Sequence, residues 1–190
     1  MRDSLLTVSL LVALIVVGGC NPAPETADTP PNAAPSSEPT EAQLPIVTLE
    51  QVQGRIQEHR GQVVVVDLWA LWCGHCVAEL PHFAQLPTKF PKQVHAISLN
   101  VDFDETTGAP SPKLITKIRK TLSDNGVEAD DLVCSTPFED VLASLDIFSL
   151  PACLIYAPDG TLAKKIEGAV SYESDVFPLL ETLVSSEQIQ

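Results

Sequence analysis

The chain has 190 residues, of which 25 are acidic and 11 are lysine or arginine, and its formal net charge at pH 7 is −14. This balance argues against nucleic-acid binding, which requires basic patches. It is typical of a soluble exported surface.

Residues 1–19 have the pattern of an export signal. Arg2 gives a positive start, and the apolar run from 5 to 17 is too short to span a membrane comfortably. The run ends in Val-Gly-Gly-Cys at 17–20, which resembles a bacterial lipobox. We therefore expect Cys20 to be lipidated and to hold the protein at a bacterial membrane, on the periplasmic side of the cell envelope. An uncleaved anchor is the alternative.

Residues 20–44 are expected to form a disordered linker after the lipidated cysteine. Six prolines lie between positions 22 and 39, among small and polar residues, and the segment has no aromatic residue. Such a segment cannot bury enough apolar surface to offset its ordering entropy. Proline stiffens it into a spacer, which leaves 45–190 as a single domain.

Strands and helices are expected to alternate along this domain. Thr48 with Gln51 has the pattern of a capping box, and Pro110-Ser111-Pro112 opens a further helix that Gly126 ends. Ser174 is the expected cap of the last helix, with Pro178 tolerated in its first turn. The predicted strands are 46–47, 63–66, 94–101, 132–134, 152–156 and 162–167, and the predicted helices are 48–59, 77–90, 112–125, 138–145 and 174 onward.

The clearest chemical signal is Cys73-Gly74-His75-Cys76, which follows the buried valine strand. Helical apolar spacing begins directly after it, so Cys73 is predicted to stand where a strand ends and a helix begins. The first turn of a helix has free N–H groups and a partial positive charge, and both favour a thiolate over a thiol.

A Cys-x-x-Cys pair is either half of a zinc site or a redox couple, and less often an inert structural disulfide. Zinc sites usually need a second such pair, or two histidines at a fitting spacing. The sequence has neither. We therefore predict a redox pair, with no bound metal and no cofactor.

The surrounding residues resemble the thioredoxin superfamily over about 45–185. Asp67 stands six residues before Cys73, Pro81 eight after it, Ser149-Leu150-Pro151 precedes an apolar strand, and Gly168 precedes the last helix. The spacing from Cys76 to Pro81 is similar to the C-x-x-E-x-P of the membrane-tethered TlpA/ResA branch. The resemblance implies an α/β thioredoxin fold, with a central mixed sheet flanked by helices. The helix at 112–125 and its strand resemble the insertion of that branch.

The resemblance also implies roles in thiol–disulfide exchange. Cys73 would be the attacking thiolate, Cys76 the resolving thiol and Asp67 a buried proton acceptor with a raised pKa. Glu79 is either a second such group or a residue that favours the helix dipole. His75 replaces the usual proline, and Cys-Gly-His-Cys resembles protein disulfide isomerase. We expect His75 to make the couple more oxidising, unless it is a neutral exposed side chain.

A second set of residues is expected to contact the client. Trp72 is predicted to lie on the active-site surface, whereas Trp69 is expected in the core. Leu150 and Pro151, the latter in the cis form, would pair with an extended client strand. Two glycines would let the client backbone approach closely, namely Gly74 and Gly168.

The expected partners are protein thiol or disulfide clients in the envelope, such as apocytochrome c, and a membrane redox partner. Two other classes remain open: a copper- or zinc-binding module that uses Cys73, His75 and Cys76, and an interaction protein whose pair only switches docking. Two further cysteines, Cys134 and Cys153, are expected to be buried and unpaired, with a disulfide between them as the alternative.

Overall fold

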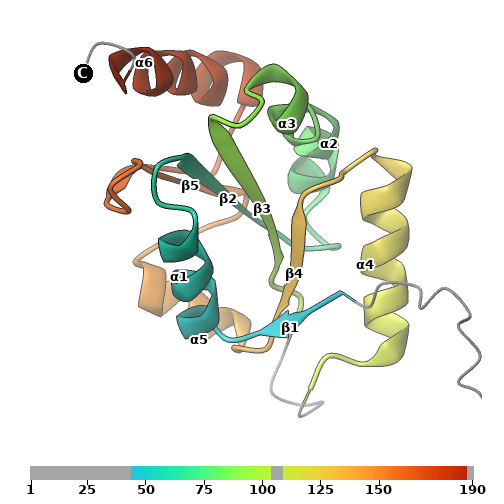
Figure 1. The fold of residues 1–190 in the computed structure, drawn as a ribbon. Coiled ribbons are helices and arrows are strands. Elements are labelled where there is room, and N and C mark those ends of the chain that lie inside the picture. Colours follow the sequence, from blue (N-terminus) through green and yellow to red (C-terminus); the bar gives the residue numbers. More distant parts are fainter. Residues whose placement is uncertain (1–43, 104–108, 188–190) are drawn as a thin grey trace, which may run out of the picture. The chain divides into compact units, whose positions relative to one another are not determined.

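A six-stranded sheet forms the centre of the molecule (Figure 1). The computed structural model describes residues 44–103 and 109–187, all within one compact unit that spans 41–190. The strands, in spatial order, are β1 (Ile46–Val47), β4 (Asp130–Cys134), β3 (Val94–Asn100), β2 (Val63–Trp69), β5 (Ala152–Tyr156) and β6 (Leu162–Glu167). The first four run parallel, and β5 is antiparallel to both β2 and β6. The mixed sheet that the resemblance implied is therefore confirmed.

Strand β2 lies in the middle of the sheet and is buried along its whole length. Its valines, the first four residues, pack on both faces, as expected for a strand covered by helices on both sides. The strand continues through Asp67 to Trp69, three residues beyond the predicted end at Val66. As a result, the buried carboxyl group of Asp67 is held by a central strand.

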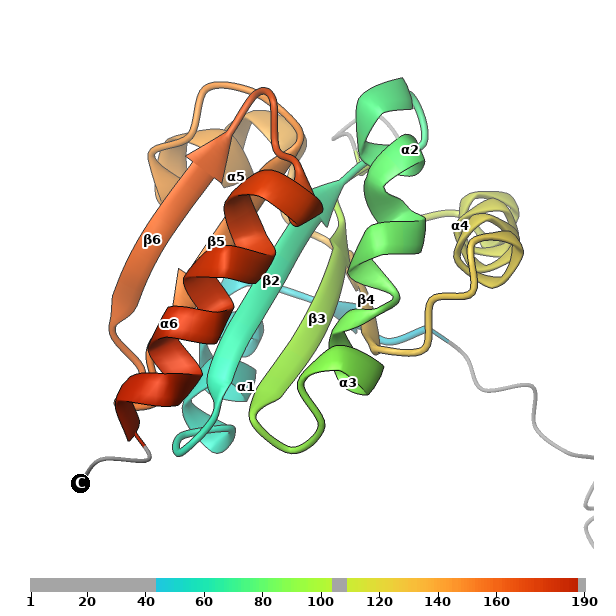
Figure 2. The same ribbon diagram turned by 90° about the horizontal axis from the view of Figure 1, so that it is seen from above.

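Helices cover both faces of this sheet. Figure 2 shows α2 (Gly74–Phe83), α3 (Leu86–Lys89) and α6 (Phe177–Glu187) over one face, with α1 (Leu49–Glu58) and α5 (Phe138–Leu145) behind the other. Helix α4 (Pro112–Asp124) lies beside β4. The layers place the start of α2 directly after the carboxyl end of β2.

One of the two predicted helix caps is confirmed, and so is the helix start predicted at residues 110–112. Thr48 and Gln51 form the expected capping box of α1, and the Ser111 side chain accepts a hydrogen bond from Leu114 N at the start of α4. The prediction for Ser174 was wrong. Ser171 is the cap, and its hydroxyl accepts from Ser174 N, so the chain becomes helical three residues earlier.

The segment after Ser171 is the π-helical turn η2 (Tyr172–Val176), which continues into α6. Val176 N donates to Ser171 O at 3.3 Å, an i to i+5 bond. Pro178 lies in the first turn of α6, as predicted, but the helical segment already begins at Tyr172. Turns of this kind occur often at functional sites.

The helix start predicted at Cys73 is confirmed, but the stretch with helical spacing over 77–90 is not one continuous helix. Helix α2 begins at Gly74, directly after Cys73, and ends at Phe83. A separate turn, α3, follows, with Pro87 near its start. Pro87 has no N–H to extend the ladder of α2, so the chain begins a new helix there.

The predictions for the export signal, Cys20 and most of the linker fall on residues outside the described ranges. Within 44–103 and 109–187, no helix has both the length and the apolar character needed to cross a bilayer. The free state of Cys134 and Cys153 was predicted and is confirmed, since both are buried and unpaired.

Candidate active site

The Cys73–Cys76 pair forms a disulfide at the start of α2, with Cα atoms 5.3 Å apart. Cys73 is the N-cap of the helix, and its Sγ accepts a hydrogen bond from Cys76 N at 3.2 Å. Exposure differs between the two residues, at 8% for Cys73 and 1% for Cys76. The helix start therefore offers an N–H donor to the more accessible sulfur. This arrangement favours Cys73 as the thiolate when the disulfide opens.

Asp67 is a carboxylic acid in the core, and only 3% of its surface is exposed. Burial raises its pKa from 3.8 to about 7, a hydrogen bond from Tyr172 opposes that rise, and the charge of Glu79 adds to it. The raised pKa predicted for this carboxyl group is therefore present, and its main cause is loss of hydration. Near neutral pH the group can both release and accept a proton.

Tyr172 is the residue of this site that sequence reasoning missed. Its hydroxyl donates to Asp67 Oδ1 at 2.7 Å, and its side chain is fully buried. Burial, with the charge of Asp67 as the next cause, raises the pKa of Tyr172 well above 10, and Cys153 also hydrogen-bonds its hydroxyl. No local pattern marks Tyr172, because it lies 105 residues from Asp67 in the chain.

Glu79 connects α2 to the segment that carries Tyr172. Its Oε2 accepts a hydrogen bond from Tyr172 N at 3.1 Å and lies 3.4 Å from Nδ1 of His82. The carboxylate thus binds the start of η2 rather than the N–H groups of its own helix. Its charge reaches Asp67, because it is one cause of the raised pKa of that acid.

His75 makes a second link between the same two segments. Its Nε2 lies 3.1 Å from the carbonyl oxygen of Val170, so in the tautomer that carries a proton there it donates to that carbonyl. His75 and Glu79 together fasten the first turns of α2 to residues 170–172. The imidazole therefore has a defined orientation beside the disulfide, although its side chain is exposed.

The predicted client-binding loop is built around Leu150–Pro151, which is a cis peptide bond as expected. Gly168 N donates to Pro151 O at 2.9 Å and fixes the loop against the end of β6. Gly168 has φ +83°, and an added Cβ would lie 3.6 Å from Ser149 Oγ, so its backbone angle rather than crowding requires glycine. Around Gly74, a Cβ would meet nothing within 4 Å.

The two tryptophans have the separate positions predicted for them. Trp69 is fully buried, and its Nε1 donates to Ser98 Oγ at 2.9 Å. Trp72 is 61% exposed next to Cys73, and its ring meets that of Phe138 edge-on at 5.2 Å. Trp72 therefore presents a large apolar surface beside the reactive sulfur.

A row of polar side chains crosses the sheet through Asp67. The strand registers place Cys153, Asp67, Ser98 and Asp131 next to one another on β5, β2, β3 and β4. Burial raises the pKa of Asp131 to about 6, while hydrogen bonds from Ser98 and the Ala129 backbone act against the rise. The row thus ends in a second acid with a raised pKa.

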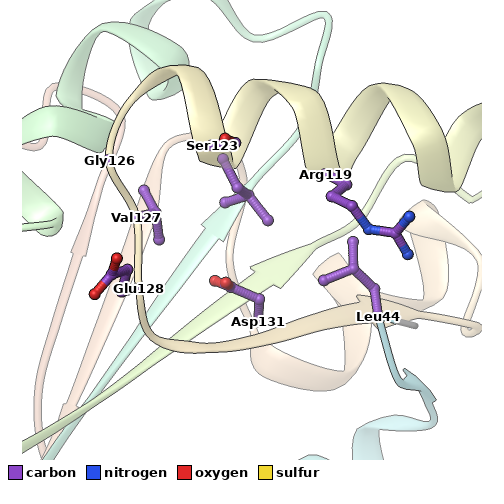
Figure 3. A pocket seen from close by; sticks show the side chains of 8 residues that line it. Leu44, Arg119, Ser123, Gly126, Val127, Glu128 and Asp131 are labelled. Carbon is purple, nitrogen blue, oxygen red and sulfur yellow. The ribbon is translucent and has the colours of Figure 1, made fainter. Parts of the chain in front are cut away.

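Asp131 lines a small hollow between β4 and α4 (Figure 3). Its Oδ1 is buried without a hydrogen-bond partner among the described residues. The hollow is also lined by Leu44, Arg119, Leu122, Ser123, Gly126, Val127 and Glu128. It is separate from the disulfide, because Asp131 is two strands away from Asp67.

Within the described ranges, no three His, Cys, Asp or Glu side chains are placed to hold a metal ion. The chemistry that the described site supports is exchange at sulfur, with a buried acid on the adjoining strand.

Comparisons of sequence agree with this chemistry. The family model "Thioredoxin" matches residues 44–146. The thiol-disulfide oxidoreductase ResA of Geobacillus thermodenitrificans (strain NG80-2) is 26% identical over 136 residues, which cover 71% of each chain. Thioredoxin H-type of Oryza sativa subsp. indica is 47% identical over 45 residues, which cover 24% of this chain and 34% of that protein.

Solved structures show the same fold. A thiol-disulfide isomerase from Corynebacterium glutamicum has a TM-score of 0.56 and 19% identity, and the match covers 67% of this chain and 84% of that one. The thioredoxin domain of a thiol-disulfide oxidoreductase from Bacteroides vulgatus has a TM-score of 0.51 and 20% identity, with coverage of 67% and 82%. The chain therefore belongs to the thioredoxin family, and it is a thioredoxin-like thiol–disulfide oxidoreductase.

Proposed function

We propose that this enzyme is exported, anchored by lipid on Cys20, and exchanges its Cys73–Cys76 couple with protein clients of the cell envelope. The observation that carries the exchange is the cap at the start of α2, where Cys73 Sγ accepts the N–H of Cys76. The lipobox-like end of the apolar segment at 17–20 supports the anchor. The relation to ResA supports an envelope client.

The exchange starts at Cys73 because it is the more accessible sulfur. In the reduced enzyme its thiolate attacks a client disulfide, so one client sulfur leaves as a thiolate and a mixed disulfide forms. Cys76 then attacks Cys73 Sγ, which closes the enzyme disulfide and releases the second client thiol. The same steps in reverse oxidise a client dithiol.

Asp67 is the proposed proton acceptor for Cys76. A group with a pKa of about 7 is partly ionised at neutral pH, so it can take the thiol proton as Cys76 attacks. The Tyr172 hydroxyl holds the carboxylate in place through its 2.7 Å hydrogen bond. Glu79 acts on the same acid through its charge and fixes the backbone of Tyr172.

The client backbone is proposed to lie along the loop at Leu150 and Pro151, with Gly74 and Gly168 beside it. Nothing meets a Cβ at Gly74 within 4 Å, so this side of the disulfide is open to a partner. Trp72 supplies exposed apolar surface next to Cys73. Leu150 stands next to Pro151 in this loop, where the thioredoxin resemblance implies Thr or Val, and it would adjust client preference.

Cysteine variants of the full-length protein test the exchange. Cys73→Ser should abolish insulin reduction, and Cys76→Ser should accumulate a mixed disulfide because the resolving thiol is missing. Cys134→Ala is the matched control, since Cys134 is also a cysteine but is buried and free, and it should keep activity. Full activity of the Cys73→Ser variant would refute the proposal.

The anchor is tested separately. Mass spectrometry of the protein from bacterial membranes should show an acylated Cys20 as the first residue. A Cys20→Ala variant should lose the lipid while its purified domain keeps exchange activity. Recovery of an unmodified Cys20 within an intact chain would overturn the lipid anchor without affecting the exchange chemistry.

A further inference from the structure

Two hollows flank Trp72, the exposed residue next to Cys73. One, of about 520 Å³, is lined by the apolar residues Leu71 and Leu114 and by the cations of Lys113 and Lys117. The other, of about 560 Å³, also has Trp72 in its lining but otherwise different walls apart from Asp102. It has apolar walls that include Val101, Phe103 and Phe138, and Glu139 and Asp140 contribute acidic groups. The two hollows share Trp72 and Asp102, so they adjoin each other at the active site.

The lysines of the first hollow have no structural role among the described residues. Lys113 and Lys117 are exposed, and neither forms a hydrogen bond or ion pair with another residue that the structure describes. Lys120 on the same helix differs, because it pairs with Asp124 at 2.7 Å. Lys113 also stands in the first turn of α4, where a positive charge opposes the helix dipole.

The positive charges of Lys113 and Lys117 therefore lower the stability of α4 rather than raise it. Like charges at i and i+4 repel each other on a helix surface, and the chain has only 11 lysine and arginine residues against 25 acids. Two exposed cations beside the reactive centre of an acidic protein are placed to attract a negatively charged partner.

The acids of the second hollow have the opposite effect. Glu139 and Asp140 lie exposed in the first turn of α5, where negative charge favours the helix dipole. They nevertheless make this side of Trp72 negative. Asp102, which lines both hollows, already accepts hydrogen bonds from Leu71 N and Asn100 Nδ2 at 2.7 Å. The charged residues other than Asp102 thus differ in sign between the two hollows that share Trp72.

We propose that the two hollows form one client groove of opposite polarity at its two ends. It selects protein segments whose reactive cysteine has carboxylates on one side and cationic side chains on the other. This inference rests on the proposed exchange and adds a client class to it. The reverse order of charges would place carboxylates against Glu139 and Asp140, and cations against Lys113 and Lys117, which disfavours that register.

A pair of isomeric peptides tests the groove. One has two lysines before its cysteine and two glutamates after it, the other has the reverse order, and a third has neutral flanks. Each peptide thiol is added to the oxidised enzyme. The peptide thiolate attacks Cys73 Sγ and releases the Cys76 thiolate, and a second peptide thiolate then yields the peptide disulfide and the reduced enzyme. Alkylation quenching and mass spectrometry give the rates.

One order should react roughly three- to tenfold faster than the other at low salt, as expected for a few exposed ion pairs. The preference should decline toward unity in 0.5 M salt. Because the peptides are isomers, their net charge and composition cannot cause the difference. Equal rates for the two orders at low salt would overturn the groove. Failure of the neutral peptide to react at all would instead count against the exchange itself.

Variants assign the preference to the named residues. The double variant Lys113→Ala with Lys117→Ala should weaken the preference. A separate variant that reverses the charge of both hollows should invert the preference; it combines Lys113→Glu, Lys117→Glu, Glu139→Lys and Asp140→Lys. Lys120→Glu is the control on the same helix and should leave the preference unchanged. Circular dichroism checks the folding of each variant. A preference that survives both sets unchanged would contradict the assignment.

Discussion

The buried acid Asp67 should make the stability of the oxidised protein depend on pH. Its folded pKa of about 7 lies about three units above the value of 3.8 for a free side chain. Between these two values the folded state holds a proton that the unfolded state has released. The contribution of Asp67 to stability is therefore fully present below about pH 4 and is lost as the pH rises to about 7.

The size of the loss follows from the shift. Each pKa unit corresponds to about 1.4 kcal/mol, so the full change is about 4 kcal/mol. Asp67→Asn removes the ionisation and keeps an oxygen that can accept the Tyr172 hydroxyl. Wild type loses about 4 kcal/mol of unfolding free energy through Asp67 between pH 4 and pH 8, and the variant does not. The unfolding free energy of the variant minus that of wild type should therefore increase by about 4 kcal/mol over this range. A constant cost of burying the amide does not alter that difference.

Urea unfolding of both proteins with the disulfide intact, from pH 4 to pH 9, measures this gain. Trp69 fluorescence can report the transition, since its ring is buried. Asp131→Asn serves as a control, because the pKa of Asp131 is about 6 and its smaller effect should be complete about one pH unit lower. A difference between wild type and Asp67→Asn that stays constant across this range would refute a raised pKa.

Three further variants test the site and the core. Tyr172→Phe removes the hydrogen bond that lowers the pKa of Asp67, so an NMR titration of its carboxyl carbon should show that pKa rise by roughly one to two units; an unchanged value would contradict the contact. His75→Pro removes a polar group beside the Cys73 thiolate, at a helical position that tolerates proline. Glutathione equilibration should therefore give a lower reduction potential for the variant. An equal potential would exclude the role of His75 in raising the potential of the couple. Leu80→Ala, at a fully buried position, should cost about 2–5 kcal/mol in urea unfolding; a cost well under 1 kcal/mol would contradict its packing.

The local parts of the fold could be predicted because short windows of sequence encode them. The capping box of Thr48 and Gln51, the buried valines of β2 and the position of Cys73 at a helix start depend on residues only a few positions apart. The cap at Ser171 was missed for a related reason. Ser171 and Ser174 are both suitable caps three residues apart, and tertiary contacts of Tyr172 favour the earlier one.

The long-range part of the site could not be read in this way. Tyr172 reaches Asp67 only because α6 packs over the same face of the sheet as α2 (Figure 2). Neither periodicity nor spacing marks a tyrosine at the start of a helix as the partner of an acid 105 residues away. The same holds for the link between Glu79 and Tyr172 N, which needs the helices in place.

The two edge strands of the sheet, β1 and β6, affect whether crowded copies of this protein aggregate. Strand β1 has only two residues, and β6 carries Lys164 and Lys165 and pairs with β5 through an irregular register at Ile155 and Tyr156. Short length, lysines and bulges each discourage the addition of a foreign strand. Under the proposed lipid anchor, copies would meet one another often on the membrane, and edges of this kind would keep neighbouring copies from joining into fibrils.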